Sequence, residues 1–153
     1  MLDNVIKDEE FALMMQRHIE EMIGYMFEKE QYFSILCKIE DVSFEPELPE
    51  DIHSQFRSLT IFLIAEYTFE SARIIEDKLV FEAGFGKENV GSFVSVPLLS
   101  IMQIIIDNNN PILINLATYK QLKRINKKVD ENGVQNSMNS FLSNPENSKF
   151  LKK

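Results

Sequence analysis

Residues 79–105 read LVFEAGFGKENVGSFVSVPLLSIMQII, and this stretch decides the fold. In its first part, apolar side chains recur at every second position, which predicts a strand over residues 78–85. One face of that strand carries Leu79, Phe81, Ala83 and Phe85, and the other carries Val80, Glu82, Gly84 and Gly86. The glycines predict a hairpin that leads to a second strand over residues 93–96. Because two glycines follow each other on the open face, backbone is left uncovered there, and another extended chain can approach it.

The segment after the hairpin predicts a helix over residues 97–106. Pro97 suits the first helical position, because its missing N–H group has no intrahelical bond to lose there. Apolar residues then follow at the spacing of one helix face, namely Leu98, Ile101, Met102 and Ile105. The polar run at residues 107–111 predicts a turn that ends the helix, and a last strand is predicted over residues 112–117.

The residues before this stretch predict one helix and three strands. The helix covers residues 8–29 with Asp8 as its N-cap, and the strands cover residues 32–39, 58–66 and 73–75. The strand at 58–66 is apolar on both faces, which is typical of a central strand covered on both sides. Meandering strands with a helix at each edge predict a mainly β fold, a small open barrel or sandwich preceded by an N-terminal helix.

The predicted first helix has two neighbouring apolar stripes. One holds Ala12, Met15, Ile19, Ile23 and Met26, and the other holds Phe11, Met14, His18, Met22 and Tyr25. Together they offer more apolar surface than one interface needs. Two interpretations are open: both stripes form one wide core face, or one covers the sheet and the other contacts a second subunit.

Composition and charge limit the classes of function. A chain of 153 residues with 44% hydrophobic content predicts one core, so a single domain is expected over residues 1–119. This part carries 8 basic and 21 acidic side chains, a net charge of −13, which disfavours nucleic acid as a partner. One cysteine, no long apolar run and no signal peptide are typical of a cytoplasmic protein outside the membrane. Cys37 alternates with apolar residues, so we expect a buried, inert thiol.

No catalytic constellation is recognised in the sequence, and no metal ion or other cofactor is predicted. His18 and His53 lack Cys or carboxylate neighbours at the spacing of metal ligands. Residues 84–87 read GFGK, but they lack the spacing of a phosphate-binding loop and lead into a strand. We therefore do not expect an enzyme.

The order and spacing of these elements resemble the stringent starvation protein B (SspB) family, in particular its divergent short branch. The resemblance covers roughly residues 11–116 and is carried by the strand end at 83–86, the Val96-Pro97 step, the apolar strand at 61–65 and the Leu48-Pro49 step. It implies an SH3- or Sm-like meander of strands. It also implies a non-enzymatic adaptor, which captures peptides carrying ssrA-like degradation tags and tethers the cargo to the ClpX unfoldase of the bacterial ClpXP protease.

The resemblance further implies which residues bind. The peptide groove would consist of Tyr67, Thr68, Phe69, Ala83, Gly84, Phe85 and Gly86. The first helix would pair the subunits of a homodimer through Met15, Ile19, Met22 and Met26. This chain has Gly84 where the family places an arginine, and the neighbouring residues Glu66, Glu70 and Glu82 are acidic. Because ssrA tags are acidic themselves, either the tag is less acidic here, or Lys87 supplies the missing charge, or the groove binds other cargo.

The last part of the chain has a different character. Residues 120–132 form a basic segment, and residues 133–153, rich in Asn and Ser, predict a flexible tail. The resemblance implies that the tail docks on the unfoldase through Phe150, Leu151, Lys152 and Lys153. A second apolar pair, Phe141-Leu142, is an alternative anchor, and a merely solubilising end is also open. The alternative function is an Sm-like RNA-binding module, or a scaffold without a role in protease delivery.

Overall fold

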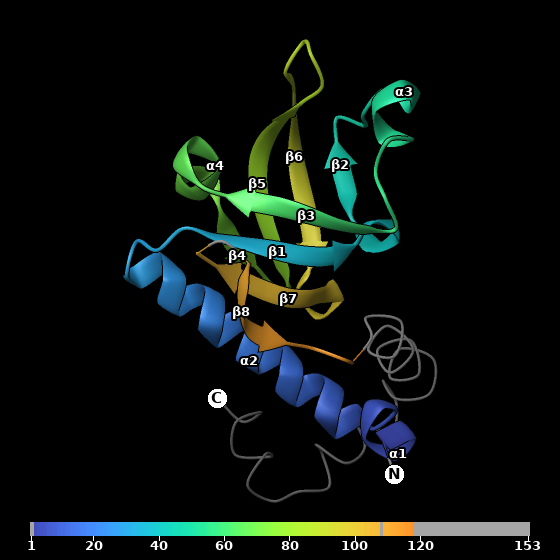
Figure 1. Cartoon of the computed structure of the whole chain (residues 1–153), viewed down its shortest axis with the longest axis vertical. Coiled ribbons are helices and arrows are strands. Elements are labelled where there is room, and N and C mark those ends of the chain that lie inside the picture. Colours follow the sequence, from blue (N-terminus) through green and yellow to red (C-terminus); the bar gives the residue numbers. More distant parts are fainter. Residues whose placement is uncertain (1, 108, 118–153) are drawn as a thin grey trace, which may run out of the picture.

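The computed structural model describes residues 2–107 and 109–117, and they fold into two antiparallel sheets and a long N-terminal helix (Figure 1). The first sheet has the strand order β3-β1-β7-β8 and the second has the order β2-β6-β5-β4, and together they do not form a closed barrel. The strands are β1 Phe33–Lys38, β2 Ser43–Glu45, β3 Leu59–Ile64, β4 Arg73–Ile75, β5 Lys78–Phe85, β6 Val90–Pro97, β7 Ile101–Ile106 and β8 Asn110–Ile114. The helices are α1 Leu2–Ile6, α2 Glu9–Glu28, α3 Glu50–His53 and α4 Glu66–Ser71, with short 3-10 turns at Ile39–Asp41 and Leu98–Ser100. The prediction of mostly strands preceded by an N-terminal helix is confirmed.

The hairpin of β5 and β6 is the longest pairing of the second sheet. Its register runs from Lys78 opposite Pro97 to Phe85 opposite Val90, so the strand predicted at 78–85 is confirmed. The turn between the strands has left-handed backbone at Gly86 (φ 75°) and Asn89 (φ 52°). Glycine and asparagine tolerate this conformation better than other residues, so the turn sequence suits its geometry.

The helix predicted over residues 97–106 is wrong. Only Leu98–Ser100 form a 3-10 turn, and Ile101–Ile106 form strand β7, which pairs with β1 and β8. In the pairing with β1, Leu36 lies opposite Gln103 and Cys37 opposite Ile101, so Met102 is an extra residue. Such a β-bulge shifts the alternation of inward and outward side chains by one residue. The buried residues Ile101 and Ile104 are therefore three positions apart and not two. This spacing imitates a helix in the sequence.

Strand β3 is not the central, doubly covered strand that was predicted. It is the edge of the first sheet and pairs only with β1 among the described strands. Its residues Phe62 and Ile64 face the core, whereas Leu59, Ile61 and Leu63 have 44%, 58% and 65% of their surface exposed. The apolar run has one buried face and one open face, which composition alone does not distinguish from two buried faces.

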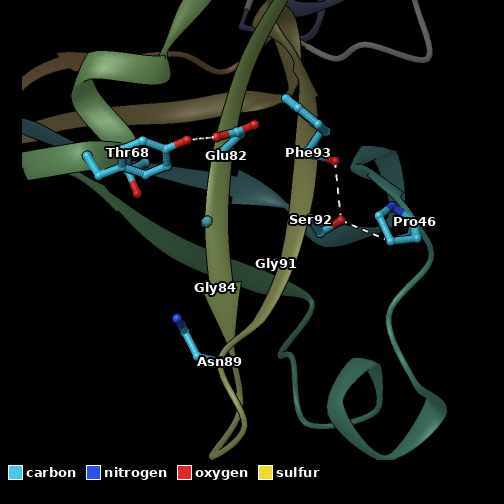
Figure 2. A pocket seen from close by; sticks show the side chains of 10 residues that line it. Pro46, Thr68, Glu82, Gly84, Asn89, Gly91, Ser92 and Phe93 are labelled. Carbon is cyan, nitrogen blue, oxygen red and sulfur yellow. Dashed lines mark hydrogen bonds between the residues drawn. The ribbon is translucent and has the colours of Figure 1, made fainter.

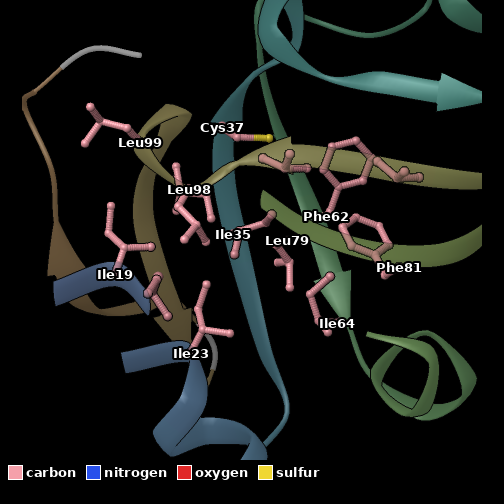
Figure 3. Close-up of a cluster of buried hydrophobic side chains, with 14 of the residues drawn as sticks. Ile19, Ile23, Ile35, Cys37, Phe62, Ile64, Leu79, Phe81, Leu98 and Leu99 are labelled. Carbon is pink, nitrogen blue, oxygen red and sulfur yellow. The ribbon is translucent and has the colours of Figure 1, made fainter. Parts of the chain in front are cut away.

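Helix α2 supplies one wall of the core. It begins after the N-cap Asp8, whose carboxylate accepts a hydrogen bond from the Glu10 backbone N–H at 3.2 Å. Figure 3 shows Ile19 and Ile23 of this helix turned towards Leu98 and Ile35 in the interior. The buried residues of α2 are Ala12, Ile19, Ile23 and Met26.

This burial corrects the predicted subunit interface. Ile19 and Met26 belong to the core of their own chain, so they are not available to a second subunit. Met15 and Met22 are partly buried and pack against the same core. The exposed apolar residues of the helix are Leu13, Met14 and Tyr25. Burial of the first stripe agrees with both interpretations, but Met14, His18 and Tyr25 of the second stripe are exposed, so the two stripes do not form one wide core face.

An aromatic cluster fills the space between the two sheets at the end where α3 lies. Phe44 stacks on Phe56 with ring centroids 5.5 Å apart, and Phe85 meets both rings edge to face. Phe62 also contacts Phe85 and extends the cluster to Phe81. Aromatic pairs at such distances add about 0.5–1.5 kcal/mol beyond the burial of their area. Phe85 is thus directed inwards, as the alternation of β5 predicts.

Candidate binding site

A pocket of about 440 Å³ opens on the outer face of the second sheet (Figure 2). We call it the Gly84 pocket. Its lining comes from α4, from β5 and β6, from the turn between them and from the segment after β2. The lining residues are Pro46, Tyr67, Thr68, Glu82, Ala83, Gly84, Asn89, Gly91, Ser92 and Phe93. Four residues of the predicted groove, Tyr67, Thr68, Ala83 and Gly84, therefore lie in one pocket.

The floor of the Gly84 pocket is formed by two cross-strand pairs. Gly84 lies opposite Gly91, and Glu82 lies opposite Phe93. A Cβ atom added to Gly91 would meet nothing within 4 Å, so the floor is open at that position. A Cβ atom added to Gly84 would lie 2.6 Å from Cγ of Asn89. The Asn89 side chain therefore occupies the space of a Gly84 side chain, while Gly84 itself remains exposed, as expected.

Helix α4 forms one wall of the pocket and is tied to β5 by hydrogen bonds. The Tyr67 hydroxyl donates to Oε2 of Glu82, and the Glu82 backbone N–H donates to Ser71 Oγ at 2.9 Å. Ser71 Oγ in turn donates to the carbonyl of Thr68 at 2.9 Å. The bond to the Glu82 carboxylate, and the negative charge of that group, raise the pKa of the exposed Tyr67 phenol. Backbone and side chain of Glu82 are therefore both held in place.

The segment after β2 forms the opposite wall. The buried Ser92 hydroxyl donates to the carbonyl of Pro46 at 2.9 Å, as Figure 2 shows. This bond holds Pro46 against β6, on the far side of the hairpin from Thr68 and Glu82. The pocket is consequently a trough across β5 and β6 with one wall on each side.

A second, larger groove lies between α3 and the β5–β6 turn. It measures about 800 Å³, and we call it the Phe85 groove. Its lining residues are Pro49, Asp51, Ile52, Gln55, Phe56, Phe85, Gly86, Lys87, Glu88 and Val90. Two predicted groove residues, Phe85 and Gly86, lie here and do not line the Gly84 pocket. Phe69 lines neither, because its ring packs on Phe27 and Tyr32 at centroid distances of 5.7 and 5.1 Å.

The two sites differ in charge. Among residues 2–107 and 109–117, Glu82 is the one charged residue that lines the Gly84 pocket, whereas Lys87 lines the Phe85 groove together with Asp51 and Glu88. Lys87 thus lines the Phe85 groove and is not among the lining residues of the Gly84 pocket.

Several pocket residues were not singled out from the sequence, namely Pro46, Asn89, Ser92 and Phe93. Phe93 had a signal that was available. In the pairing of β5 with β6 it falls opposite Glu82, on the open face, where an exposed phenylalanine is uncommon. Pro46 and Asn89 reach the pocket only through the path of a loop and a turn, which alternation does not reveal.

Cys37 is buried, as predicted. Its thiol donates to the carbonyl of Thr60 at a sulfur–oxygen distance of 3.7 Å, and burial, aided by the charge of Asp41, raises its pKa to about 12. A thiol with this pKa is protonated near neutral pH and is a poor nucleophile. In the part of the chain that the structure describes, no group of three His, Cys, Asp or Glu side chains is placed to hold a metal ion.

Other predicted features lie outside the described residues. They are the basic segment at 120–132, the tail at 133–153 and its proposed docking residues Phe150, Leu151, Lys152 and Lys153. None of the helices in the described ranges is both long enough and apolar enough to cross a membrane.

Comparison with known protein families and with curated proteins finds no match for this chain.

Proposed function

We propose that the protein is a non-enzymatic adaptor of the SspB type, which captures peptides with ssrA-like degradation tags in the bacterial cytoplasm. The observation that carries the proposal is the Gly84 pocket. Tyr67 and Thr68 from α4 meet Ala83 and Gly84 from β5 around one trough. Tyr67 and Thr68 are distant in the sequence from Ala83 and Gly84, and the resemblance assigned all four to a peptide groove.

The shape of the pocket supports an extended ligand. Where glycines face each other across two strands, main-chain groups of a ligand approach closely, and the walls on either side choose among its side chains. Tyr67 and Phe93 have 63% and 44% of their surface exposed beside this trough. Rigid aromatic side chains of this kind are common anchors of peptide contacts, because little conformational entropy is lost when they bind.

Delivery to the ClpX unfoldase would follow by tethering. In this proposal residues 133–153 are the tether, and Phe150, Leu151, Lys152 and Lys153 dock on the unfoldase. A linker of this length raises the local concentration of cargo to the millimolar range, and two tethers on a homodimer add avidity. The alternative of RNA binding gains no support from the Gly84 pocket, since its charged lining residue is negative.

Peptide binding to the full-length protein tests the proposal. Anisotropy of a labelled ssrA-tag peptide of the source organism is measured with wild-type protein, with Gly91→Leu and with Gly24→Leu. A side chain at Gly91 enters the open trough without a clash, so we expect about tenfold weaker binding or more. Gly24 lies on the exposed side of α2 with equally open space, so the control variant should bind like wild type. No binding by wild type, or equal binding by Gly91→Leu, would contradict a peptide site at this pocket.

A further inference from the structure

We propose that the Gly84 pocket selects a cationic side chain, lysine or arginine, from the peptide that it binds. The inference rests on the proposed peptide-binding function and names the chemical class of the residue that enters the pocket. It runs against the acidic tags that the resemblance implies. Three features of the pocket carry it: a fixed carboxylate, an aromatic side chain beside it and an acidic row across the sheet.

The carboxylate of Glu82 is prepared to receive a cation. Its backbone is fixed by the bond to Ser71, and its side chain accepts the bond from the Tyr67 hydroxyl. An ionised carboxylate offers about four acceptor positions, and the tyrosine uses one of them. A guanidinium or ammonium group can therefore bind this carboxylate without breaking the Tyr67 bond. Because the carboxylate is already held, less side-chain entropy is lost when the ligand binds.

The neighbouring aromatic surface suits the long stem of such a residue. Phe93 lies directly opposite Glu82 on the adjacent strand, and both line the pocket (Figure 2). Lysine and arginine place their methylene groups along apolar surface while the charged end reaches a polar partner. Pro46 and Phe93 offer that surface, and a cation over an aromatic ring gains about 0.5–1 kcal/mol at an exposed site.

The charges around the pocket point the same way. Glu45 of β2 pairs with Phe93 on its other side, so Glu45, Phe93 and Glu82 form one row across three strands. Residues directly opposite each other share a face of the sheet, so both carboxylates flank the ring. Arg73 lies on this face opposite Val80, outside the pocket lining. With a net charge of −13 over residues 1–119, the surroundings attract basic peptides and repel acidic ones.

The experiment compares tag peptides that differ only in charge. Each acidic residue of the labelled ssrA-tag peptide is replaced in turn by Gln and by Lys, and binding to the full chain is measured at low and high salt. We expect one Lys peptide to bind about tenfold more tightly than its acidic parent at about 50 mM salt. The advantage should shrink at about 500 mM salt, because exposed charges are screened there.

Two variants assign the preference to the pocket. Glu82→Gln keeps an acceptor for Tyr67 but removes the charge, and it should reduce the lysine preference to about threefold or less. Glu88→Gln removes a carboxylate from the Phe85 groove and should leave the preference unchanged. Equal binding of all charge variants, or a preference that survives Glu82→Gln, would overturn the inference.

The failure of this inference differs from the failure of the proposed function. If peptides bind to wild type without any charge preference, and Gly91→Leu abolishes their binding, the peptide site stands and only its proposed selectivity for a cationic side chain is wrong. If no peptide of the series binds to wild type, both are wrong.

Discussion

Replacing Asn115 by alanine should destabilise the fold more than the loss of one surface side chain. Asn115 is 1% exposed and follows β8 directly. Its Nδ2 donates to the carbonyls of Leu99 and Ile101 at 3.1 and 3.0 Å, and its Oδ1 accepts from the Ala117 N–H at 2.8 Å. Its backbone N–H donates to Met102, the bulged residue of β7, at 2.8 Å. The side chain thus joins the 3-10 turn, the start of β7 and the end of the described chain.

The magnitude follows from these bonds. The three shortest side-chain bonds contribute about 1 kcal/mol each, and alanine removes them while it keeps the backbone bond, so the loss is about 3 kcal/mol. A domain of this size is stable by about 5–15 kcal/mol, so Asn115→Ala should still fold. Urea unfolding followed by circular dichroism should show a midpoint lower by about 1–2 M, and thermal unfolding a midpoint lower by about 10–15 °C.

A matched control is Asn110→Ala, at the first position of β8. Asn110 is exposed and makes one side-chain bond, from Nδ2 to the carbonyl of Asp107 at 2.9 Å. Its loss should cost less than about 1 kcal/mol. If Asn115→Ala lowered the free energy of unfolding no more than this control, water would be replacing the lost bonds to the carbonyls of Leu99 and Ile101. The hydrogen bonds of the Asn115 side chain would then not stabilise the fold.

Three further predictions concern the core, the thiol and the tail. Met26→Glu should unfold the protein, because a buried unpaired charge costs several kcal/mol. Met22 is only partly buried, so Met22→Glu should stay folded. Circular dichroism distinguishes the two variants, and size-exclusion chromatography reports any loss of a dimer. Cys37 should resist iodoacetamide at pH 9 until urea is added. Because its pKa rises from 9.0 to about 12 on folding, the stability it contributes is complete below pH 9 and is lost as the pH approaches 12. Deleting residues 149–153 should leave peptide affinity unchanged but abolish accelerated degradation by ClpXP; weaker peptide binding would refute the separation of roles.

Alternation in the sequence predicts the hairpin well but does not predict the layers of the fold. The strand at 78–85 is confirmed because its inward residues are all apolar and its partner strand pairs without interruption. Strand β7 was missed because the bulge at Met102 converts a period of two into a spacing of three. The position of β3 at an edge was missed because its exposed face is as apolar as its buried face.

The candidate site is predictable in part for a similar reason. Ala83 and Gly84 are consecutive residues of β5, and Tyr67 and Thr68 are consecutive residues of α4, so the resemblance located each pair as a unit. Phe85 is separated from Gly84 because adjacent residues of a strand point to opposite faces. The other wall depends on the bond from Ser92 to Pro46, which joins residues 46 positions apart and leaves no local pattern in the sequence.

The bond between Tyr67 and Glu82 also has an optical consequence. The chain has four tyrosines and no tryptophan, so tyrosine emission is its intrinsic fluorescence. An excited phenol is a stronger acid than a phenol at rest, and a carboxylate that accepts its hydrogen bond takes the proton and quenches the light. We therefore expect the emission of Tyr67 to be quenched while it donates to Glu82. A ligand that breaks this bond makes the residue emit, whereas a cation that binds Glu82 alongside Tyr67 leaves it quenched, so tyrosine emission distinguishes the two ways of occupying the pocket.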